Sequence, residues 1–130
     1  MAAQDAELDL AVLQVNTSDL PYVPFGDSDA LEAGSATKVL GFPFGRRLEV
    51  GKRSGDDVIP EATVTGGSLS AARADEEGGT RFLQTDASVH PGSSGGPMLD
   101  EDGYLIGVVK MKVAEGRAAA GPGFGVPVNL

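Results

Sequence analysis

The sequence is organised around Val89-His90-Pro91-Gly92-Ser93-Ser94-Gly95-Gly96-Pro97, which places a pair of serines among three glycines, two prolines and the only histidine. Glycines at this density let the backbone adopt left-handed conformations and let another molecule approach the main chain closely. A serine in such a loop exposes its hydroxyl, and neighbouring backbone N–H groups can receive a developing oxyanion, as acyl transfer requires. The alternative is a solvent-exposed Gly/Ser loop, which the composition alone favours.

Two other chemical interpretations of this stretch fail on context. Gly92-Ser93-Ser94-Gly95-Gly96 matches the nucleophile elbow of α/β-hydrolases, but that motif needs a helix directly after the serine and a histidine later in the chain. Here Pro97 and a strand hairpin follow, and no histidine occurs after Ser94. A phosphate-binding loop is excluded too, because no Lys-Ser/Thr pair completes it.

Composition and charge limit which classes of protein this chain can belong to. The 130 residues suffice for one domain or for part of a larger one. A net charge of −9 argues against nucleic-acid binding, since no basic stripe offsets phosphate repulsion. The absence of cysteine excludes disulfides and thiolate metal sites, and no segment has the length of a membrane span. The first residues do not resemble a signal peptide.

Short apolar runs with glycine-rich turns predict strands on both sides of this loop. Downstream, Asp100-Glu101-Asp102-Gly103 is a hairpin turn signal. Glycines within the run from 61 to 72 indicate a bulge or a barrel corner. Charged residues 46–60 and the acidic segment 73–80 are expected to be surface loops. The pattern predicts an antiparallel barrel or sandwich with strands at Ala36–Phe42, Glu61–Ala72, Arg81–Thr85, Pro97–Leu99, Tyr104–Val113 and Phe124–Val128.

The first apolar run, Leu8–Val15, predicts a buried strand that contains Asp9. A carboxylate there is costly unless paired, so Asp9 is a candidate for orienting a histidine or capping a turn. Alternatively, Asp9 lies at a strand end and meets solvent. The connector that follows is predicted to contain a short helical piece within 26–34, capped by Ser28 or Asp29.

Six motifs in this order resemble HtrA/Deg-type trypsin-like serine peptidases, whose catalytic groups occur in the order histidine, aspartate, serine. The resemblance implies an all-β protein, with an antiparallel six-stranded Greek-key barrel in residues 36–130 as the C-terminal barrel of a double-barrel fold. Residues 1–20 would end the N-terminal barrel, and residues 21–35 would connect the two. The motifs are Asp9-Leu10-Ala11-Val12-Leu13, Phe25-Gly26-Asp27-Ser28-Asp29-Ala30-Leu31, Gly41-Phe42-Pro43-Phe44-Gly45, Gln84-Thr85-Asp86-Ala87, Pro91-Gly92-Ser93-Ser94-Gly95-Gly96-Pro97 and Gly123-Phe124-Gly125-Val126-Pro127-Val128-Asn129.

The resemblance also implies roles for single residues. Ser94 matches the nucleophile, the N–H groups of Gly92 and Ser94 match the oxyanion hole, and Asp9 matches the carboxylate that orients the catalytic histidine. No cofactor or metal is expected. An uncharged, small or medium apolar side chain is expected before the cleaved bond, because no acidic pocket base is evident. The residues expected to border the substrate are Ser88, His90, Lys110, Met111 and Lys112.

One departure from the family pattern decides whether this chain is expected to be active. The catalytic histidine should precede the aspartate, yet none of the eight residues before Asp9 is histidine. His90 stands only four residues before Ser94, where the family commonly has asparagine, so the resemblance gives it a role in loop shape or substrate contact; an exposed loop histidine is the alternative. We therefore expect either a fragment of a peptidase or half of a two-chain assembly, inactive as an isolated polypeptide.

The expected partners follow from these assignments. They are a peptide or protein substrate and a missing N-terminal barrel, or another copy, covering an exposed apolar face. An extracytoplasmic location is favoured by the resemblance. The other hypothesis is a non-catalytic module that holds an extended peptide in the Ser94 groove, because the histidine is missing.

Overall fold

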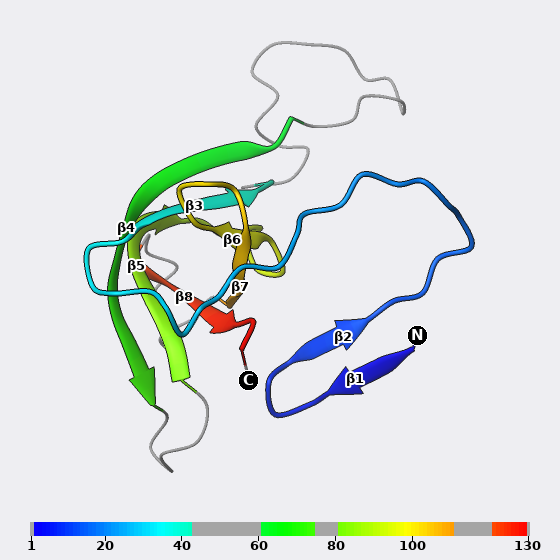
Figure 1. Ribbon diagram of the computed structural model, residues 1–130, viewed down its shortest axis with the longest axis horizontal. Coiled ribbons are helices and arrows are strands. Elements are labelled where there is room, and N and C mark those ends of the chain that lie inside the picture. Colours follow the sequence, from blue (N-terminus) through cyan, green and yellow to red (C-terminus); the bar gives the residue numbers. More distant parts are fainter. Residues whose placement is uncertain (1, 43–60, 75–80, 111–120, 130) are drawn as a thin grey trace.

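The computed structural model describes residues 2–42, 61–74, 81–110 and 121–129, and its regular elements are all β-strands (Figure 1). None of these described residues forms a helix with the length and apolar character needed to cross a membrane. The predicted loop at 46–60, residues 75–80 of the predicted loop at 73–80, and residues 111–113 of the predicted strand lie outside the described residues. The loop prediction was wrong for Arg73 and Ala74, which pair with Phe82 and Arg81 in a strand. The strands are β1 (Ala3–Asp5), β2 (Leu10–Val12), β3 (Ala36–Gly41), β4 (Thr63–Ala74), β5 (Arg81–Val89), β6 (Pro97–Leu99), β7 (Leu105–Lys110) and β8 (Gly121–Pro127).

Strands β3 to β8 form one closed barrel in the order β3-β4-β5-β8-β7-β6. Every neighbouring pair is antiparallel, so the predicted all-β class and the six-stranded antiparallel barrel are confirmed. The ring closes where β3 meets β6, with Lys38 opposite Leu99 and Val39 opposite Met98. The turn at 100–103 is also confirmed, since Gly103 has a φ of 89° and its N–H donates to the Asp100 carbonyl.

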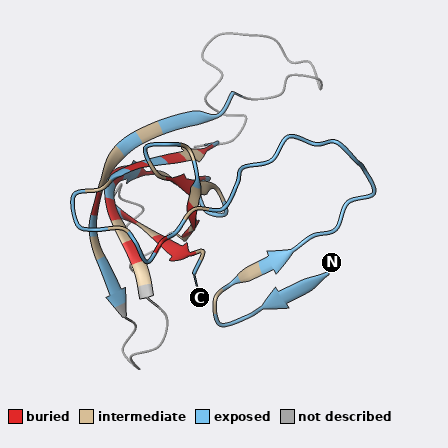
Figure 2. Cartoon of the chain, in the orientation of Figure 1, coloured by how far each residue is buried: buried red, intermediate tan, exposed pale blue. Residues whose placement is uncertain are grey.

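Alternating side chains of the strands fill the barrel, because successive residues of a strand point to opposite faces (Figure 2). In β3, for example, Thr37 and Val39 are buried while Ala36 and Lys38 are exposed. The barrel interior is therefore a packed apolar core rather than a channel. Its buried members are Val39, Leu69, Leu83, Ala87, Val89, Met98, Ile106 and Val109.

Two buried threonine hydroxyls lie within this core, 2.6 Å apart, on Thr37 and Thr85. The Thr85 hydroxyl donates to the Ser68 carbonyl at 3.0 Å, so the proton shared by the pair comes from Thr37. Thr85 Oγ1 also accepts from the Ala87 N–H at 3.1 Å. These bonds fix β5 where its pairing with β8 shifts register, between Thr85 and Ser88. A bulge re-aims a strand, and this one precedes the Ser94 loop.

The N-terminal segment differs from its prediction. The expected buried strand Leu8–Val15 is a short hairpin strand, Leu10–Val12, that pairs only with β1. The expectation of burial was wrong: Leu13 is 70% and Val15 is 62% exposed. An apolar run shows that a face is suited to burial, but it does not show what covers that face. Within this run only Leu8 and Leu10 are partly buried, where they face the barrel, and Figures 1 and 2 show the hairpin standing beside the barrel.

The connector contains turns rather than the predicted helical piece. Ser28 caps no helix, because its hydroxyl and N–H both lie 3.3 Å from Asn129 Oδ1, and its Oγ accepts from the Asn129 N–H at 3.1 Å. Asp27 accepts from the Asn129 side-chain amide at 2.9 Å. These contacts tie the connector to the chain just after β8 and use the polar groups that a helix cap would need.

Asp86 adds a pH-dependent bond to the barrel. Its carboxylate accepts from the Ser68 N–H at 2.6 Å and from the Ser68 hydroxyl at 3.1 Å. The backbone bond, and after it the side-chain bond, lowers the pKa of Asp86 below its ordinary 3.8. A carboxyl whose pKa falls on folding stabilises the fold above its unfolded pKa, and this contribution disappears as the pH falls through the folded pKa.

We therefore expect Asp86→Asn to lower the free energy of unfolding at neutral pH and to have a diminishing effect as the pH falls below 3.8. Urea titrations of both proteins across that range measure the difference. Asp29→Asn is the control, because Asp29 is also exposed and its side chain accepts no described hydrogen bond. A wild-type advantage that stays constant with pH would contradict the prediction.

Candidate active site

The loop between β5 and β6 consists of two consecutive tight turns. The Ser93 N–H donates to the His90 carbonyl and the Gly96 N–H donates to the Ser93 carbonyl, both at 3.0 Å. Gly92 and Gly95 have φ values of 98° and 84°, a left-handed region that side chains disfavour. The glycine spacing in the sequence therefore sets the path of this loop.

The two serines of the loop have different surroundings. Ser93 is only 5% exposed, and its side chain lies so close to Gly41 that a Cβ there would come within 2.8 Å of Ser93 Oγ. Ser94, in contrast, is exposed. A hydroxyl must be accessible to attack a substrate, so the burial pattern favours Ser94 over Ser93 as a nucleophile.

The backbone around Ser94 offers donors. Within the described part of the chain, the N–H groups of Gly92 and Ser94 donate to no recorded acceptor, and both residues are exposed. The next residues are held firmly: the Gly95 N–H donates to the Val109 carbonyl and the Val109 N–H to the Gly96 carbonyl, both at 2.8 Å. Donors held in place in this way are what stabilisation of an oxyanion requires, and the oxyanion-hole role of Gly92 and Ser94 stays a prediction.

Asp9 lies in the turn of the β1–β2 hairpin, with a φ of 59°. The turn is shaped by Asp5, whose Oδ1 accepts from the N–H groups of Glu7 and Leu8 at 2.9 Å each. The Asp9 side chain is exposed, as the alternative of a strand-end aspartate meeting solvent predicted. Its carboxylate is therefore accessible to a further group.

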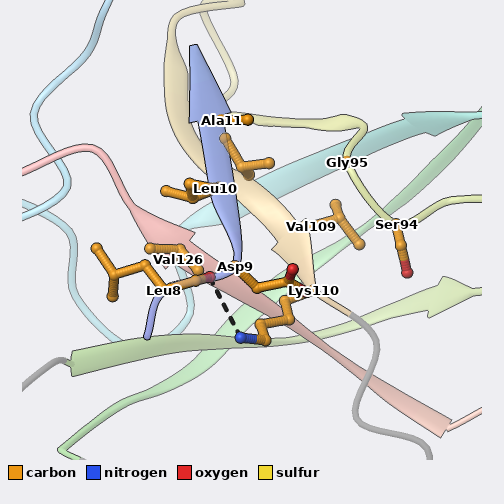
Figure 3. Close-up of a pocket in the computed structure, with 10 residues that line it drawn as sticks. Leu8, Asp9, Leu10, Ala11, Ser94, Gly95, Val109, Lys110 and Val126 are labelled. Atoms are coloured by element: carbon orange, nitrogen blue, oxygen red, sulfur yellow. Dashed lines mark hydrogen bonds between the residues drawn. The ribbon is translucent and has the colours of Figure 1, made fainter. Parts of the chain in front are cut away.

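One pocket of about 340 Å³ brings Asp9 and Ser94 together (Figure 3). The hairpin forms one side, and β7, β8 and the Ser94 loop form the other. The Lys110 side chain extends from β7 toward the hairpin, and its ammonium donates to the Leu8 carbonyl at 3.2 Å. Most of the walls are apolar or backbone: the lining residues are Leu8, Asp9, Leu10, Ala11, Ser94, Gly95, Val108, Val109, Lys110 and Val126.

The other residues singled out from the sequence lie elsewhere. Ser88, His90 and Gly92 do not line this pocket. The carbonyl of Ser88 accepts from the Thr65 hydroxyl at 2.9 Å, and that of His90 accepts from Ser93. Met111 and Lys112 are outside the described residues. The described residues bring together no three side chains suited to a metal ion.

Sequence reasoning missed two features of this pocket. Lys110 contacts the turn that carries Asp9, and Val109 holds the loop that carries Ser94. No local sequence pattern predicts either contact, because each joins residues that are distant in the chain. A lysine at the end of an apolar strand was the only available signal.

Comparisons with known proteins agree on one family. A family model described as a trypsin-like peptidase domain matches residues 1–108. The chain is 39% identical over 129 residues to a probable periplasmic serine endoprotease, DegP-like, of Chlamydia pneumoniae, covering 95% of this chain and 23% of that protein. It is 34% identical over 131 residues to the periplasmic pH-dependent serine endoprotease DegQ of Escherichia coli K12, covering 100% of this chain and 26% of that protein. It thus spans about a quarter of the length of these curated relatives.

A solved structure shows the same relation in three dimensions. The HtrA-type protease AlgW with a decapeptide superposes with a TM-score of 0.76 and is 34% identical in sequence. The match covers 95% of this chain and 35% of that chain.

Proposed function

Because this chain belongs to the trypsin-like peptidase domain family and is of the HtrA type, we propose that it forms the nucleophile-bearing part of a serine endopeptidase. The observation that carries the proposal is the pocket shared by Ser94 and Asp9, beside backbone donors that have no acceptor among the described residues. Exposure of Ser94 and burial of Ser93 support the same choice of nucleophile.

In the proposed reaction, Ser94 Oγ attacks the carbonyl carbon of a peptide bond while its proton passes to a general base. The N–H groups of Gly92 and Ser94 bind the negatively charged oxygen of the tetrahedral intermediate. The intermediate then collapses, the C–N bond breaks, and the base returns the proton to the leaving amine. Water hydrolyses the resulting ester at Ser94 in the same way, which releases the acid and restores the hydroxyl.

The base in this proposal is a histidine supplied by a segment outside this chain. The space between Asp9 and Ser94 supports this choice, because an imidazole there would have a carboxylate on one side and the serine on the other. Asp9 would hold the ring in the tautomer that accepts the serine proton. His90 is not the base in this proposal, because it does not line the pocket that Asp9 and Ser94 share. It lies in the same loop as Ser94, four residues earlier in the chain. The 130 residues alone would be inactive.

The proposed partners are a peptide and a second protein segment. The similar solved structures are of HtrA-type proteases with a tripeptide or a decapeptide, which supports an extended peptide as substrate here. A second segment, from an N-terminal barrel or another copy, would cover the apolar side chains exposed along the hairpin and connector. These are Val12, Leu13, Val15, Leu20, Tyr22, Val23 and Phe25.

The second candidate is a peptide-holding module without catalysis, which the peptides named with the similar solved structures support. The natural gene upstream of Met1 separates the two hypotheses, because the peptidase requires a histidine encoded there in a strand-turn segment. Relatives named as periplasmic support a location outside the cytoplasm for either one.

A fluorophosphonate probe tests the nucleophile in the full-length natural protein. Such probes phosphonylate an activated serine, so we expect wild-type and Ser93→Ala proteins to be labelled and Ser94→Ala to lose all labelling. Ser93→Ala is the matched control because the two hydroxyls are adjacent and only that of Ser94 is exposed. Equal labelling of both variants would refute the assignment, and an unlabelled wild type with a folded barrel would favour the peptide-holding module.

A further inference from the structure

The β1–β2 hairpin forms a separate two-stranded sheet beside the barrel. Among the described residues its two strands pair only with each other, and Ala3–Asp5, Ala11 and Val12 are all exposed. The connector that follows, residues 13–25, is exposed throughout. The position of Asp9 relative to Ser94 therefore depends on the contacts that the hairpin turn makes with this barrel.

Lys110 makes that connection. Among hydrogen bonds recorded between described residues, the one from Lys110 Nζ to the Leu8 carbonyl is the link between residues 2–12 and the barrel. Lys110 is half-buried at the end of β7, and Figure 3 shows its side chain reaching toward the turn. A hydrogen bond from a charged donor is stronger than one between neutral groups.

The accepting carbonyl lies directly before Asp9 in the backbone, so the hydrogen bond acts on the conformation of Asp9. The Leu8 carbonyl belongs to the peptide unit that immediately precedes the Asp9 Cα, so its direction determines the φ angle of Asp9. That angle is 59°, a left-handed value that is disfavoured for residues with a side chain. The Leu8 N–H is held at the same time by Asp5. The bond from Lys110 thus stabilises the backbone conformation from which the carboxylate projects.

The end of β7 also holds the other half of the site. The neighbour of Lys110, Val109, exchanges backbone hydrogen bonds with Gly95 and Gly96, directly after Ser94. Two consecutive residues of one strand therefore contact the Ser94 loop and the Asp9 turn. Their covalent link fixes the distance between the two turns as long as both contacts persist.

We propose that Lys110 is a positioning residue for Asp9, and that its ammonium holds the hairpin turn in register with the Ser94 loop. The proposal rests on the proposed function, in which Asp9 orients the catalytic base. It gives Lys110 a role different from the substrate contact that the family resemblance implies. In this role Lys110 acts through the Leu8–Asp9 peptide and touches no reacting atom.

The test compares Lys110→Met and Lys110→Arg in the full-length natural protein. Methionine keeps an unbranched side chain but removes the donor and the charge, whereas arginine retains both. We expect Lys110→Met to lower the maximal rate of fluorophosphonate labelling about tenfold, as loss of one charge-assisted bond would. The probe concentration for half-maximal rate should not change, and Lys110→Arg should restore most of the rate.

A second readout does not depend on catalysis. Hydrogen exchange at the Glu7 and Leu8 amides should become about tenfold faster in Lys110→Met, because the turn opens more often. Lys38→Met is the matched control: Lys38 Nζ likewise donates to a backbone carbonyl, that of Glu101 at 3.1 Å, on a hairpin turn that does not line the pocket. It should change neither the labelling rate nor exchange at the Asp9 turn.

Three outcomes would overturn the proposal. Unchanged exchange at the Asp9 turn would show that Lys110 does not hold it. Faster exchange with an unchanged labelling rate would show that holding the turn does not serve the reaction. A higher half-maximal concentration with unchanged exchange would assign Lys110 to substrate contact instead. An unlabelled wild type refutes the proposed function, and exchange then decides separately whether Lys110 holds the turn.

Discussion

An Asp9→Asn variant of the full-length natural protein is expected to lose about four orders of magnitude in kcat. The asparagine side chain can present an NH2 donor to the imidazole, which leaves the ring in the wrong tautomer, and its neutral amide does not stabilise the charged imidazolium. The backbone should be unaffected, because asparagine tolerates the left-handed φ of 59° as well as aspartate does. Turnover of an unfolded, fluorescently labelled casein measures the loss.

Asp19→Asn is a close control for this experiment. Asp19 is also exposed and also has a φ of 59°, but it does not line the pocket. We expect its kcat to equal that of the wild type and the thermal stability of both variants to be unchanged. Full activity of Asp9→Asn would refute the proposed role of Asp9 and leave Ser94 and the proposed oxyanion donors as the candidate catalytic groups of this chain.

The second large effect concerns stability. Gly96→Ala is expected to lower the free energy of unfolding by about 3 kcal/mol or more, because it forces a methyl group into a filled space. A Cβ at this position would overlap the Leu40 carbonyl oxygen and come within 2.9 Å of the Ser93 carbonyl oxygen. Backbone atoms cannot move aside, since the Gly96 N–H and C=O are both engaged in hydrogen bonds. Urea denaturation monitored by circular dichroism measures the change.

Gly66→Ala makes the same chemical change where space is open. A Cβ on Gly66 would have no neighbour within 4 Å, and the residue is exposed in β4 opposite Lys38. We expect a change close to zero, since alanine also restricts the unfolded chain. If Gly96→Ala were no more destabilising than Gly66→Ala, the close packing of the loop against β3 would be wrong.

Much of the barrel could be predicted because local signals agreed with the final fold. Alternation in Ala36–Gly41 and turn formers at 100–103 are determined by residues within one element, and both were confirmed. The run Leu8–Val15 shows the limit of such reasoning. Its apolar character is real, but burial requires a covering surface, which the sequence of the run does not contain. The prediction of a helical piece in the connector was wrong for a similar reason, since Ser28 binds the distant Asn129.

The same difference between local signals and distant contacts applies to the candidate site. The turns of the Ser94 loop could be predicted because its glycines set them, whereas the catalytic roles of Ser94, Gly92 and Asp9 stay predictions. The contacts of Lys110 with the Asp9 turn and of Val109 with the Ser94 loop could not be predicted, because both residues are remote from Asp9 in the chain and carry no motif. The assignment of residues 1–20 to the end of a first barrel and of 21–35 to a connector stays a prediction.

The seam of the barrel has a consequence for the order of folding. Closure requires β3 to meet β6, and Val39 and Met98 are separated by most of the barrel sequence, so this contact carries a large loop-closure entropy. The Ser94 loop lies at that seam, with Gly96 against Leu40. We expect the loop to take its final shape only when the ring closes. A chain still being synthesised would then lack the loop geometry on which the proposed oxyanion site depends.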